Sequence, residues 1–361
     1  IVLGYCFDDV DHAVIQQIKK GSIFSLPHHL EIDVAEELVN IIPSAEMVRF
    51  GKNGSDVTAA AIRISRAYTG KDKIAICGYH GWQDWYIGTT SRNLGVPRST
   101  KDLSLTFNYN DIPSLEKLFN ENPGQIACVI IEPIGIEEPD SLFLETVKEL
   151  AHKNSAILIF DELKTGLRFA LAGVQEYTGV IPDISTFGKA IANGYPLSAI
   201  VGKRDIMEYV DKTFFSFTFG GETLSLVACL KTIEIVQKKG VIKHNWGIGS
   251  YFKEKYNKLI KEYKLENYLW NKGYDIHFVT EFESGDGFTD FELKSLVHQE
   301  MVSRGNLTIG SYEFCYSHTK EMIDQTINDI DEILKTVTQA IKEKNVKKYL
   351  KGKAVKPIFR N

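Results

Sequence analysis

Short runs of continuously apolar residues, separated by helical patterns, constrain the fold of this chain more than any other feature. A strand that is covered by helices on both faces does not alternate between apolar and polar residues, so such runs are typical of buried parallel sheets. The predicted strands are Glu46–Phe50, Lys73–Cys77, Gln125–Ile134, Ala156–Leu163, Ile184–Phe187 and Leu197–Gly202. Helical patterns separate most of them, for example at Asp56–Tyr68 and Leu142–Lys153. The alternation predicts an α/β fold with a mostly parallel central sheet flanked by helices.

The helical patterns toward the two ends of the chain predict its division into domains. Residues Asp8 to Lys20 and Glu31 to Ile41 have helical apolar spacing, so residues 1–44 are expected to form an N-terminal helical segment. Residues 45–240 contain the predicted strands and would form a large domain. After a long helix from about Ser225 the chain becomes richer in Lys and Glu, which predicts a smaller α+β domain over 241–361.

Composition and charge exclude several classes of protein. A net charge of −5 at pH 7 argues against a nucleic-acid surface as the main function. The one basic stretch, Lys342 to Arg360, is interpreted as a solvated helix end and tail, with a phosphate- or RNA-binding tail as the alternative. No apolar run approaches the roughly 20 residues that span a bilayer, so no membrane association is expected.

The five cysteines are far apart and form no C-x-x-C pair. This pattern fits neither a disulfide framework nor a zinc site, so we expect no metal and a reducing, cytoplasmic location. The opening Ile1-Val2-Leu3 has no basic segment, so we expect no signal peptide. It also lacks an initiator Met, which leaves open a fragment, a processed form or the ordered part of a longer protein.

A turn that contains glycine follows the first predicted strand, in the sequence Phe50-Gly51-Lys52-Asn53-Gly54-Ser55-Asp56. Ser55 is predicted to be the N-cap of a helix that starts at Asp56. The free N–H groups and the dipole of a helix N-terminus favour anions, so this turn is a candidate phosphate site. A nucleotide P-loop is excluded at Gly188-Lys189, because Asp183 stands where its first glycine belongs and Ala190 follows the lysine.

Two charged residues follow predicted strands that are otherwise apolar. Asp161 ends the run Ala156 to Phe160, at the edge of the sheet where α/β proteins bind ligands. Lys189 follows Ser185-Thr186-Phe187-Gly188, in a segment predicted to be interior. Burial would lower the pKa of such a lysine and make it a nucleophile.

These features together point to one cofactor. Pyridoxal phosphate needs a lysine for the Schiff base, a carboxylate that keeps its pyridine nitrogen protonated, and a dipolar site for its phosphate. Lys189, Asp161 and the turn at Ser55 supply these three groups. Tyr79, which follows the strand that ends at Cys77, could stack on the ring.

The ordered set of motifs resembles the class III aminotransferase family of fold type I, and most of all its glutamate-1-semialdehyde aminomutase branch. The motifs that carry the resemblance are Leu26-Pro27-His28, Asn53-Gly54-Ser55-Asp56, Gly78-Tyr79-His80-Gly81, Glu132-Pro133, Asp161-Glu162-Leu163, Thr165-Gly166-Leu167-Arg168, Pro182-Asp183 and Gly188-Lys189. They run through nearly the whole chain. The resemblance implies a large cofactor-binding domain, a small C-terminal domain, and an N-terminal segment that belongs to the small domain or a dimer arm.

The resemblance also implies a role for each matching residue. Asp161 and Lys189 would be catalytic, one pairing with the pyridine nitrogen and the other binding the cofactor covalently. The remaining cofactor contacts would be Gly54 and Ser55 at the phosphate, Tyr79 and Leu163 on the two faces of the ring, and Thr218 at the phosphate of a neighbouring subunit. A homodimer with shared active sites is therefore implied.

The substrate side departs from the aminomutase pattern in several places. Glu137 stands where the branch usually has Asn, and Gly220-Gly221-Glu222-Thr223 where it usually has Ser-Gly-Asn-Pro. Glu313, in contrast, matches an aminomutase position near the substrate. With Glu132 of the Glu-Pro motif, Glu137 and Glu313 are the candidate substrate residues. The family's N-terminal segment before the helix near Asp8, which helps bind the substrate carboxylate in that branch, is absent.

The favoured function is the transfer of an amino group from an amino acid donor to a keto or aldehyde acceptor. The alternatives are an intramolecular aminomutase and a pyridoxal-phosphate decarboxylase, which needs the same lysine and aspartate. The Gly220-Gly221-Glu222 variant and the ending Lys356–Arg360 resemble relatives encoded with surface-polysaccharide genes, which suggests a substrate from sugar metabolism.

Overall fold

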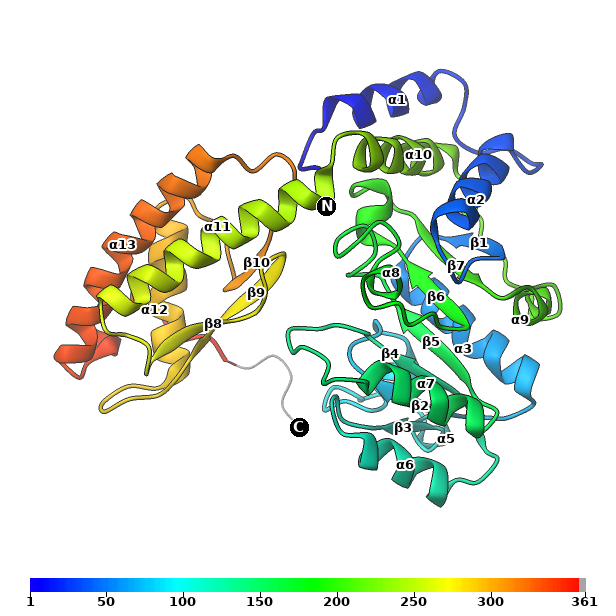
Figure 1. Cartoon of the computed structure of the whole chain (residues 1–361), viewed down its shortest axis with the longest axis horizontal. Coiled ribbons are helices and arrows are strands. Elements are labelled where there is room, and N and C mark those ends of the chain that lie inside the picture. The colour runs from blue at the N-terminus through cyan, green and yellow to red at the C-terminus, as the bar shows by residue number, and fades with distance from the viewer. Residues whose placement is uncertain (357–361) are drawn as a thin grey trace. The chain divides into compact units, whose positions relative to one another are not determined.

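The computed structural model describes residues 1–356, and these fall into two compact units (Figure 1). The first unit comprises residues 1–135 and 139–242, and the second comprises residues 136–138 together with the chain from 243 onward. The end of the predicted basic stretch, residues 357–360, lies outside the described residues. No helix within residues 1–356 is both long and apolar enough to cross a membrane.

The first unit is built on one sheet with the strand order β1-β7-β6-β5-β4-β2-β3. Its strands are β1 (Met47–Gly51), β2 (Lys73–Cys77), β3 (Ser104–Thr106), β4 (Ile126–Ile131), β5 (Ile157–Asp161), β6 (Ile184–Phe187) and β7 (Ser198–Gly202). The pairs from β6 through β3 are all parallel, whereas β7 runs antiparallel to both β6 and β1. The α/β fold with a mostly parallel sheet is therefore confirmed.

Both faces of this sheet are covered, as the continuous apolar runs predicted. Alternate residues such as Ile130 and Ile159 pack in one cluster with Ile62 and Ile64 of α3 (Gly54–Thr69). Their neighbours Leu158 and Phe160, which face the opposite way along the strand, are also fully buried. The sheet is thus a middle layer, and polar side chains can reach solvent or a ligand only where its strands end.

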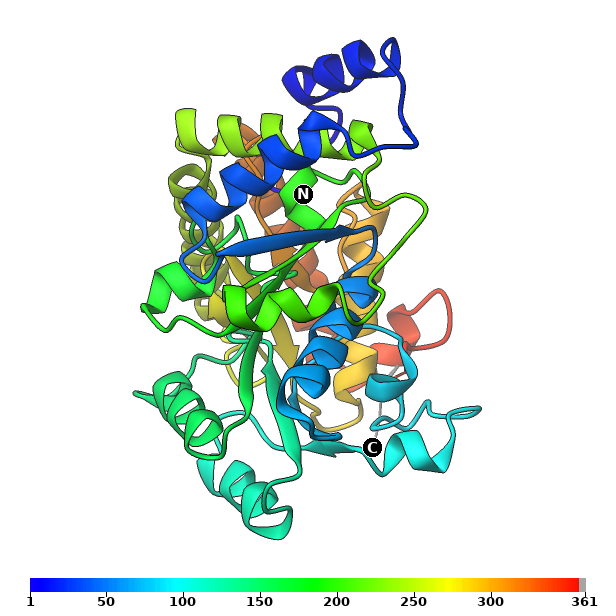
Figure 2. The ribbon, with the colours of Figure 1, turned by 90° about the vertical axis from the view of Figure 1, so that its right-hand side faces the viewer.

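Several shorter helices complete the first unit. They are α1 (Asp8–Ile18), α2 (His29–Ile41), α4 (Asp84–Ile87), α5 (Arg98–Lys101), α6 (Ile112–Glu121), α7 (Phe143–Lys153), α8 (Val174–Thr178), α9 (Arg204–Met207) and α10 (Thr223–Lys238), with 3-10 turns η1 (Lys189–Ala192) and η2 (Glu208–Val210). Figure 2 shows α1 and α2, in dark blue, beside the yellow-green α10, and both helices contact α10. Residues 1–44, expected in the small domain or a dimer arm, therefore group with the first unit, because α1 and α2 bury their apolar faces there.

The second unit contains three long helices, a short 3-10 turn and a small sheet. These are α11 (Val241–Glu262), which begins at the end of the first unit, α12 (Asp290–Ser303), α13 (Lys320–Lys342), η3 (Val346–Tyr349) and the antiparallel sheet of β8 (Leu269–Tyr274), β9 (His277–Phe282) and β10 (Ser311–Glu313). A core rich in aromatic residues, including Phe252, Tyr256 and Phe278, holds helices and sheet together.

Candidate active site

A cavity of about 170 Å³ lies in the first unit, where β2, β4, β5 and β6 end. Parallel strands bring their carboxyl ends to one edge, which is the usual ligand site of an α/β sheet. The cavity is lined by Gly54, Ser55, Tyr79, His80, Gly81, Glu132, Asp161, Leu163 and Lys189. The sequence predicted all of these residues as site residues except His80 and Gly81.

The first turn of α3 forms the wall of the cavity that was predicted to hold a phosphate. The predicted N-cap is wrong by two residues: Asn53 is the N-cap, because its backbone is extended and the Asp56 carboxylate accepts its N–H at 2.8 Å. Ser55 therefore lies inside the first turn, where its Oγ accepts the N–H of Trp82 at 3.4 Å. The helix N-terminus still faces the cavity, and an anion there would be stabilised by the helix dipole.

Glycines leave the space that surrounds this turn. A Cβ at Gly81, whose φ is +105°, would lie 2.3 Å from the Ser55 Oγ. A Cβ at Gly54 would lie 2.6 Å from Leu163 Cδ1, and one at Gly188 would lie 2.6 Å from Leu163 Cδ2. Leu163 thus occupies the space that two glycines leave open, and it joins the α3 turn to the segment that carries Lys189.

Asp161 is buried and held from both sides. Its Oδ1 accepts the N–H of Leu163 at 3.1 Å and the hydroxyl of Thr186 at 3.3 Å, while its Oδ2 lies 2.8 Å from His80 Nδ1. The other ring nitrogen of His80 lies 3.0 Å from the carbonyl oxygen of Cys77. A carbonyl only accepts, so His80 Nε2 is the donor to Cys77, while Nδ1 pairs with the carboxyl group of Asp161.

Lys189 begins the 3-10 turn η1, and its backbone is left-handed with φ +46°. The residues on either side, from Ile184 to Gly188 and from Ala190 to Ala192, are buried as predicted. The side chain of Lys189 itself is exposed, because it points into the cavity. The expectation that Lys189 would be a buried lysine is therefore wrong for the side chain and right for its surroundings.

Tyr79 and Glu132 line the cavity together. Glu132 Oε2 accepts the backbone N–H of Tyr79 at 2.8 Å, and Gly78 allows this approach because a Cβ there would lie 3.0 Å from Glu132. The Tyr79 ring is half exposed and packs edge-on against Tyr86. Its free face is therefore available to a planar ligand.

Glu162, next to Asp161, is a buried carboxyl group that sequence reasoning did not assign. Its oxygens accept the N–H groups of Val174 and Gln175 and the hydroxyl of Thr165, so it caps the start of α8. Burial raises the pKa of Glu162 to about 7. A Cβ at Gly173 would lie 2.3 Å from this carboxylate, so the glycine is required. The position of Glu162 directly after Asp161 was the available signal for this residue. His80 was also missed, although its motif Gly78-Tyr79-His80-Gly81 was recognised.

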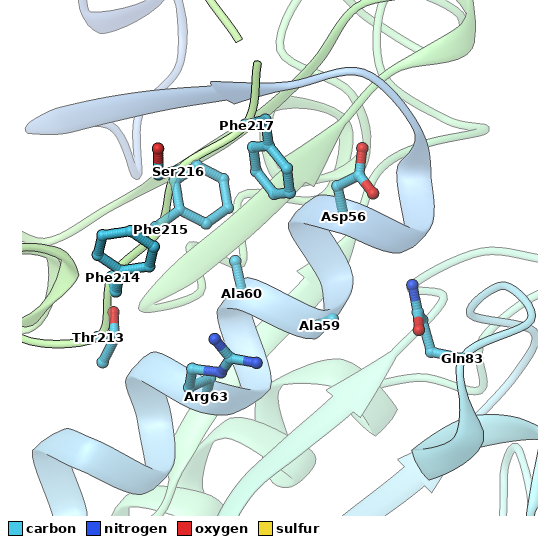
Figure 3. Close-up of a pocket in the computed structure, with 10 residues that line it drawn as sticks. All are labelled: Asp56, Ala59, Ala60, Arg63, Gln83, Thr213, Phe214, Phe215, Ser216 and Phe217. Carbon is cyan, nitrogen blue, oxygen red and sulfur yellow. The ribbon is translucent and has the colours of Figure 1, made fainter. Parts of the chain in front are cut away.

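The loop 213–222 carries Thr218, which does not line the cavity and is exposed. Figure 3 shows the preceding residues Phe214, Phe215 and Phe217 beside α3, where they line a separate cavity of about 220 Å³. The contact of Thr218 with a neighbouring subunit remains a prediction.

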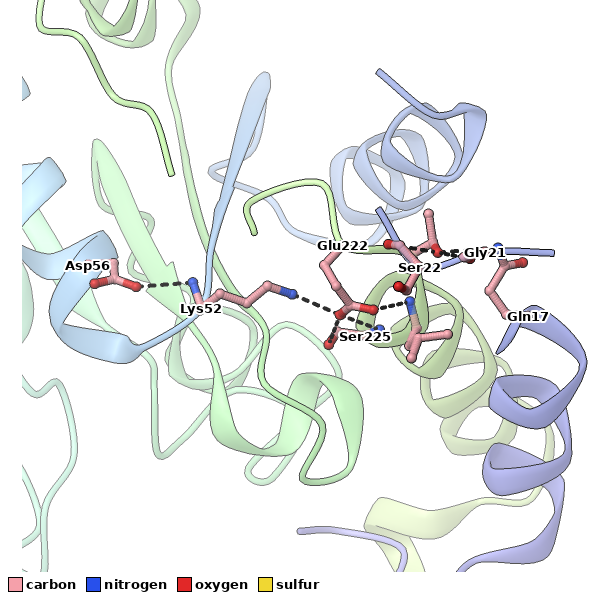
Figure 4. A network of polar contacts seen from close by, with 9 residues as sticks. Gln17, Gly21, Ser22, Lys52, Asp56, Glu222 and Ser225 are labelled. Carbon is pink, nitrogen blue, oxygen red and sulfur yellow. Dashed lines mark hydrogen bonds and ion pairs between the residues drawn. The ribbon is translucent and has the colours of Figure 1, made fainter. Parts of the chain in front are cut away.

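An ion pair ties this loop to the turn between β1 and α3 (Figure 4). Lys52 Nζ lies 3.1 Å from Glu222 Oε2, and both side chains are largely buried. Glu222 also accepts the N–H groups of Leu224 and Ser225, so it caps α10. The pKa of Lys52 is lowered by burial, against the opposing effect of Glu222. The pair therefore links the starts of α3 and α10.

Glu137 and Glu313, the other two candidate substrate residues, belong to the second unit. Glu313 lies on β10, where its Oε1 is 3.7 Å from His277 Nε2. Neither residue lines the cavity in the first unit. Their assignment to the substrate site remains a prediction.

The residues of the cavity fit pyridoxal phosphate. The start of α3, kept open by Gly54 and Gly81, accommodates a phosphate, and Asp161 offers a buried carboxylate for a protonated ring nitrogen. Lys189 supplies an accessible amine in the same cavity. Fold and site thus define a pyridoxal-phosphate enzyme of fold type I.

Comparison with known proteins agrees with this class. The family model described as aminotransferase class-III matches residues 1–285. A 3-aminobutyryl-CoA aminotransferase of Cloacimonas acidaminovorans (strain Evry) is 36% identical over 352 residues, covering 94% of this chain and 84% of the relative. Among solved structures, the FumI protein of Sphingopyxis sp. MTA144 superposes with a TM-score of 0.87 at 24% identity, covering 94% and 83% of the two chains. A glutamate-1-semialdehyde aminomutase of Pseudomonas aeruginosa PAO1 gives 0.81 at 20%, covering 93% and 82%.

The chain belongs to the class III aminotransferase family. It is a pyridoxal-phosphate-dependent enzyme that transfers amino groups, as the sequence predicted. The predicted aminomutase branch is not established by these matches, and the structural likenesses at this identity show the fold alone.

Proposed function

We propose that Lys189 and Asp161 are the catalytic residues of this aminotransferase. One observation carries the proposal: an accessible lysine amine and a buried carboxylate open onto the same cavity, beside the start of α3. Pyridoxal phosphate, when bound, supplies an electron sink that stabilises negative charge on the carbon next to the substrate nitrogen. The residues of the protein have to hold the cofactor and move the proton of that carbon.

Asp161 would hold the ring nitrogen in its protonated state, since Leu163 and His80 fix the carboxylate from two directions. Lys189 Nζ would take the proton from the amine-bearing carbon of the donor and later return a proton to the corresponding carbon of the acceptor. Gly54 and Ser55 would bind the phosphate, and Tyr79 and Leu163 would cover the two faces of the ring.

For the substrate we propose a 3-amino acyl thioester and its 3-oxo counterpart. The support is the relative at 36% identity, which is named for the amino group of 3-aminobutyryl-CoA. Beside Tyr79 the cavity wall is formed by Glu132, an acidic residue. This part of the wall suits a donor that places no carboxylate next to it. A substrate from sugar metabolism, suggested by Gly220-Gly221-Glu222 and the ending Lys356–Arg360, is the second candidate. Of that ending only Lys356 lies within the described residues.

A homodimer is part of the same proposal. The side chains of Phe214 and Phe219 on the loop of Thr218, and of Trp82 near Ser55, are largely exposed. Exposed aromatic residues gathered near a site commonly mark a protein interface. A cytoplasmic location is proposed because each of the five cysteines is free.

The test mixes the cofactor-loaded protein with 3-aminobutyryl-CoA or with an amino sugar nucleotide, and follows pyridoxamine phosphate by absorbance. Formation of pyridoxamine phosphate with the thioester alone supports the proposed substrate, and formation only with the amino sugar nucleotide favours the second candidate. With a free amino acid as a third donor, release of CO2 would indicate a decarboxylase. An isomeric product formed without an acceptor would indicate an aminomutase.

A Lys189→Ala variant tests the assignment of the catalytic lysine. Turnover should fall by at least about a thousandfold, because both nucleophile and base are lost. Lys20→Ala, on an exposed turn after α1, is the control and should retain full activity. A Lys189→Ala variant with normal turnover would overturn the proposal.

A further inference from the structure

The turn that carries Lys189 is left-handed at both ends. Lys189 has φ +46°, and Asn193, which ends η1, has φ +47°. Left-handed backbone is unfavourable for a residue with a side chain, and less so for Asn. Such a turn persists only where its surroundings hold it, so the contacts of Asn193 determine how Lys189 is presented.

Asn193 is joined to the start of the chain by two hydrogen bonds. Its Oδ1 accepts the N–H of Leu3 at 3.1 Å, and its Nδ2 donates to the carbonyl oxygen of Gly4 at 3.0 Å. Asn193 is itself 9% exposed, and Val2 and Leu3 are fully buried. One amide thus satisfies two backbone groups of a buried segment, and loss of either bond would leave a buried polar group unpaired.

The remaining contacts of the turn lead to the cavity. Gly188 O accepts the N–H of Ile191 at 3.0 Å, and the residues Ala190 to Ala192 are buried. On its other side Gly188 packs against Leu163, a residue of the cavity wall. Both flanks of Lys189 are therefore packed, and its side chain lines the cavity.

We propose that Asn193 is a positioning residue, which sets the direction of Lys189 Nζ by tying the η1 turn to residues 3 and 4. This inference rests on the proposed role of Lys189. Because Asn193 does not line the cavity, it would act on the rate of proton transfer rather than on substrate binding.

The experiment compares Asn193→Gly, which tolerates the left-handed backbone but lacks the amide, with the wild-type holoenzyme. Asn110→Gly is the matched control, since Asn110 has φ +56° and its Oδ1 accepts the Asp140 N–H at 2.9 Å outside the cavity. We expect kcat of Asn193→Gly to fall about tenfold or more, with KM within about threefold of wild type, because small misplacements of a reacting group are costly. The pH midpoint of the absorbance of the lysine-bound cofactor should shift in Asn193→Gly and stay unchanged in Asn110→Gly.

Borohydride reduction separates the two proposals. If reduction fails to attach the cofactor to Lys189 in the wild type, the proposed function is wrong. If Lys189 is labelled but Asn193→Gly retains the wild-type kcat and pH midpoint, the positioning role is wrong. The positioning role is also wrong if Asn193→Gly loses thermal stability while its cofactor-loaded fraction keeps the wild-type kcat and pH midpoint. Asn193→Asp retains an acceptor for the Leu3 N–H, so its kcat should lie between those of the wild type and Asn193→Gly.

Discussion

Replacing His80 by Phe tests how the carboxylate of Asp161 is held. The imidazole is buried between two acceptors, Asp161 Oδ2 at 2.8 Å and Cys77 O at 3.0 Å. Phe fills similar space but offers no hydrogen, so a buried carboxylate oxygen loses its partner. Gln at the same position can still donate one N–H to Asp161.

The expected loss follows from the charge and burial of this contact. A hydrogen bond to a charged group contributes roughly 1.5–3 kcal/mol, and Asp161 is only 3% exposed, so little water can replace His80. The free energy of unfolding of the cofactor-free His80→Phe protein should fall by about that amount, and that of His80→Gln by about 1 kcal/mol or less. If Asp161 needs the same contact during turnover, kcat of His80→Phe should fall about 10- to 100-fold.

Urea unfolding followed by circular dichroism measures the first quantity, and the rate of pyridoxamine phosphate formation measures the second. Equal losses in His80→Phe and His80→Gln would show that a retained N–H donor gives Asp161 no advantage, which contradicts the prediction. A fully stable and active His80→Phe enzyme would refute the view that His80 fixes Asp161.

Two further predictions concern the turn at the start of α3, where the phosphate is proposed to bind, and the pH dependence of stability. Gly81→Ala places a Cβ 2.3 Å from the Ser55 hydroxyl, so the dissociation constant of the cofactor should rise about tenfold or more in a fluorescence titration. Gly95→Ala is the control: Gly95 also has positive φ, but a Cβ there would have no atom within 4 Å, so the dissociation constant should be unchanged. Burial lowers the pKa of His298 from 6.5 to about 4. Between these two pH values the unfolded chain binds a proton at His298 and the folded chain does not, so the free energy of unfolding should fall as the pH is lowered from 6.5 to 4. His298→Gln should remove roughly 2 kcal/mol of this loss, measured by urea unfolding across that range; parallel pH profiles of the two proteins would contradict it.

The central sheet and the main residues that line the cavity could be predicted because they depend on local sequence. The run before Asp161 is apolar at every position, which is typical of a strand that is covered on both faces. A parallel sheet then brings the ends of such strands together, so Asp161, Lys189 and the turn after β1 were expected near one another without any knowledge of strand order.

Other features depend on contacts that the local sequence does not contain. Strand β3 has only three residues, too few for a periodic signal. The antiparallel direction of β7 is set by its pairing with β6 and β1, and its own residues are as apolar as those of a parallel strand. The predicted strand Gln125–Ile134 ends early, at Ile131, because Pro133 cannot donate a ladder hydrogen bond. His80 was not assigned because its role arises from a carboxylate 81 residues away.

The exposed side chain of Lys189 changes the reason why this lysine would suit the catalytic role proposed for it. The sequence placed it in an interior segment and suggested that burial activates its amine, whereas the structure buries only the residues around it. In the proposed arrangement the protein contributes direction: Gly188 leaves room for Leu163 on one side of the turn, and Asn193 is hydrogen-bonded to Leu3 at its end. In this proposal the sheet supports the cavity, whereas the turn sets the direction of the Lys189 amine. Substitutions in the turn should therefore lower kcat more than equally conservative substitutions of the apolar residues of the sheet.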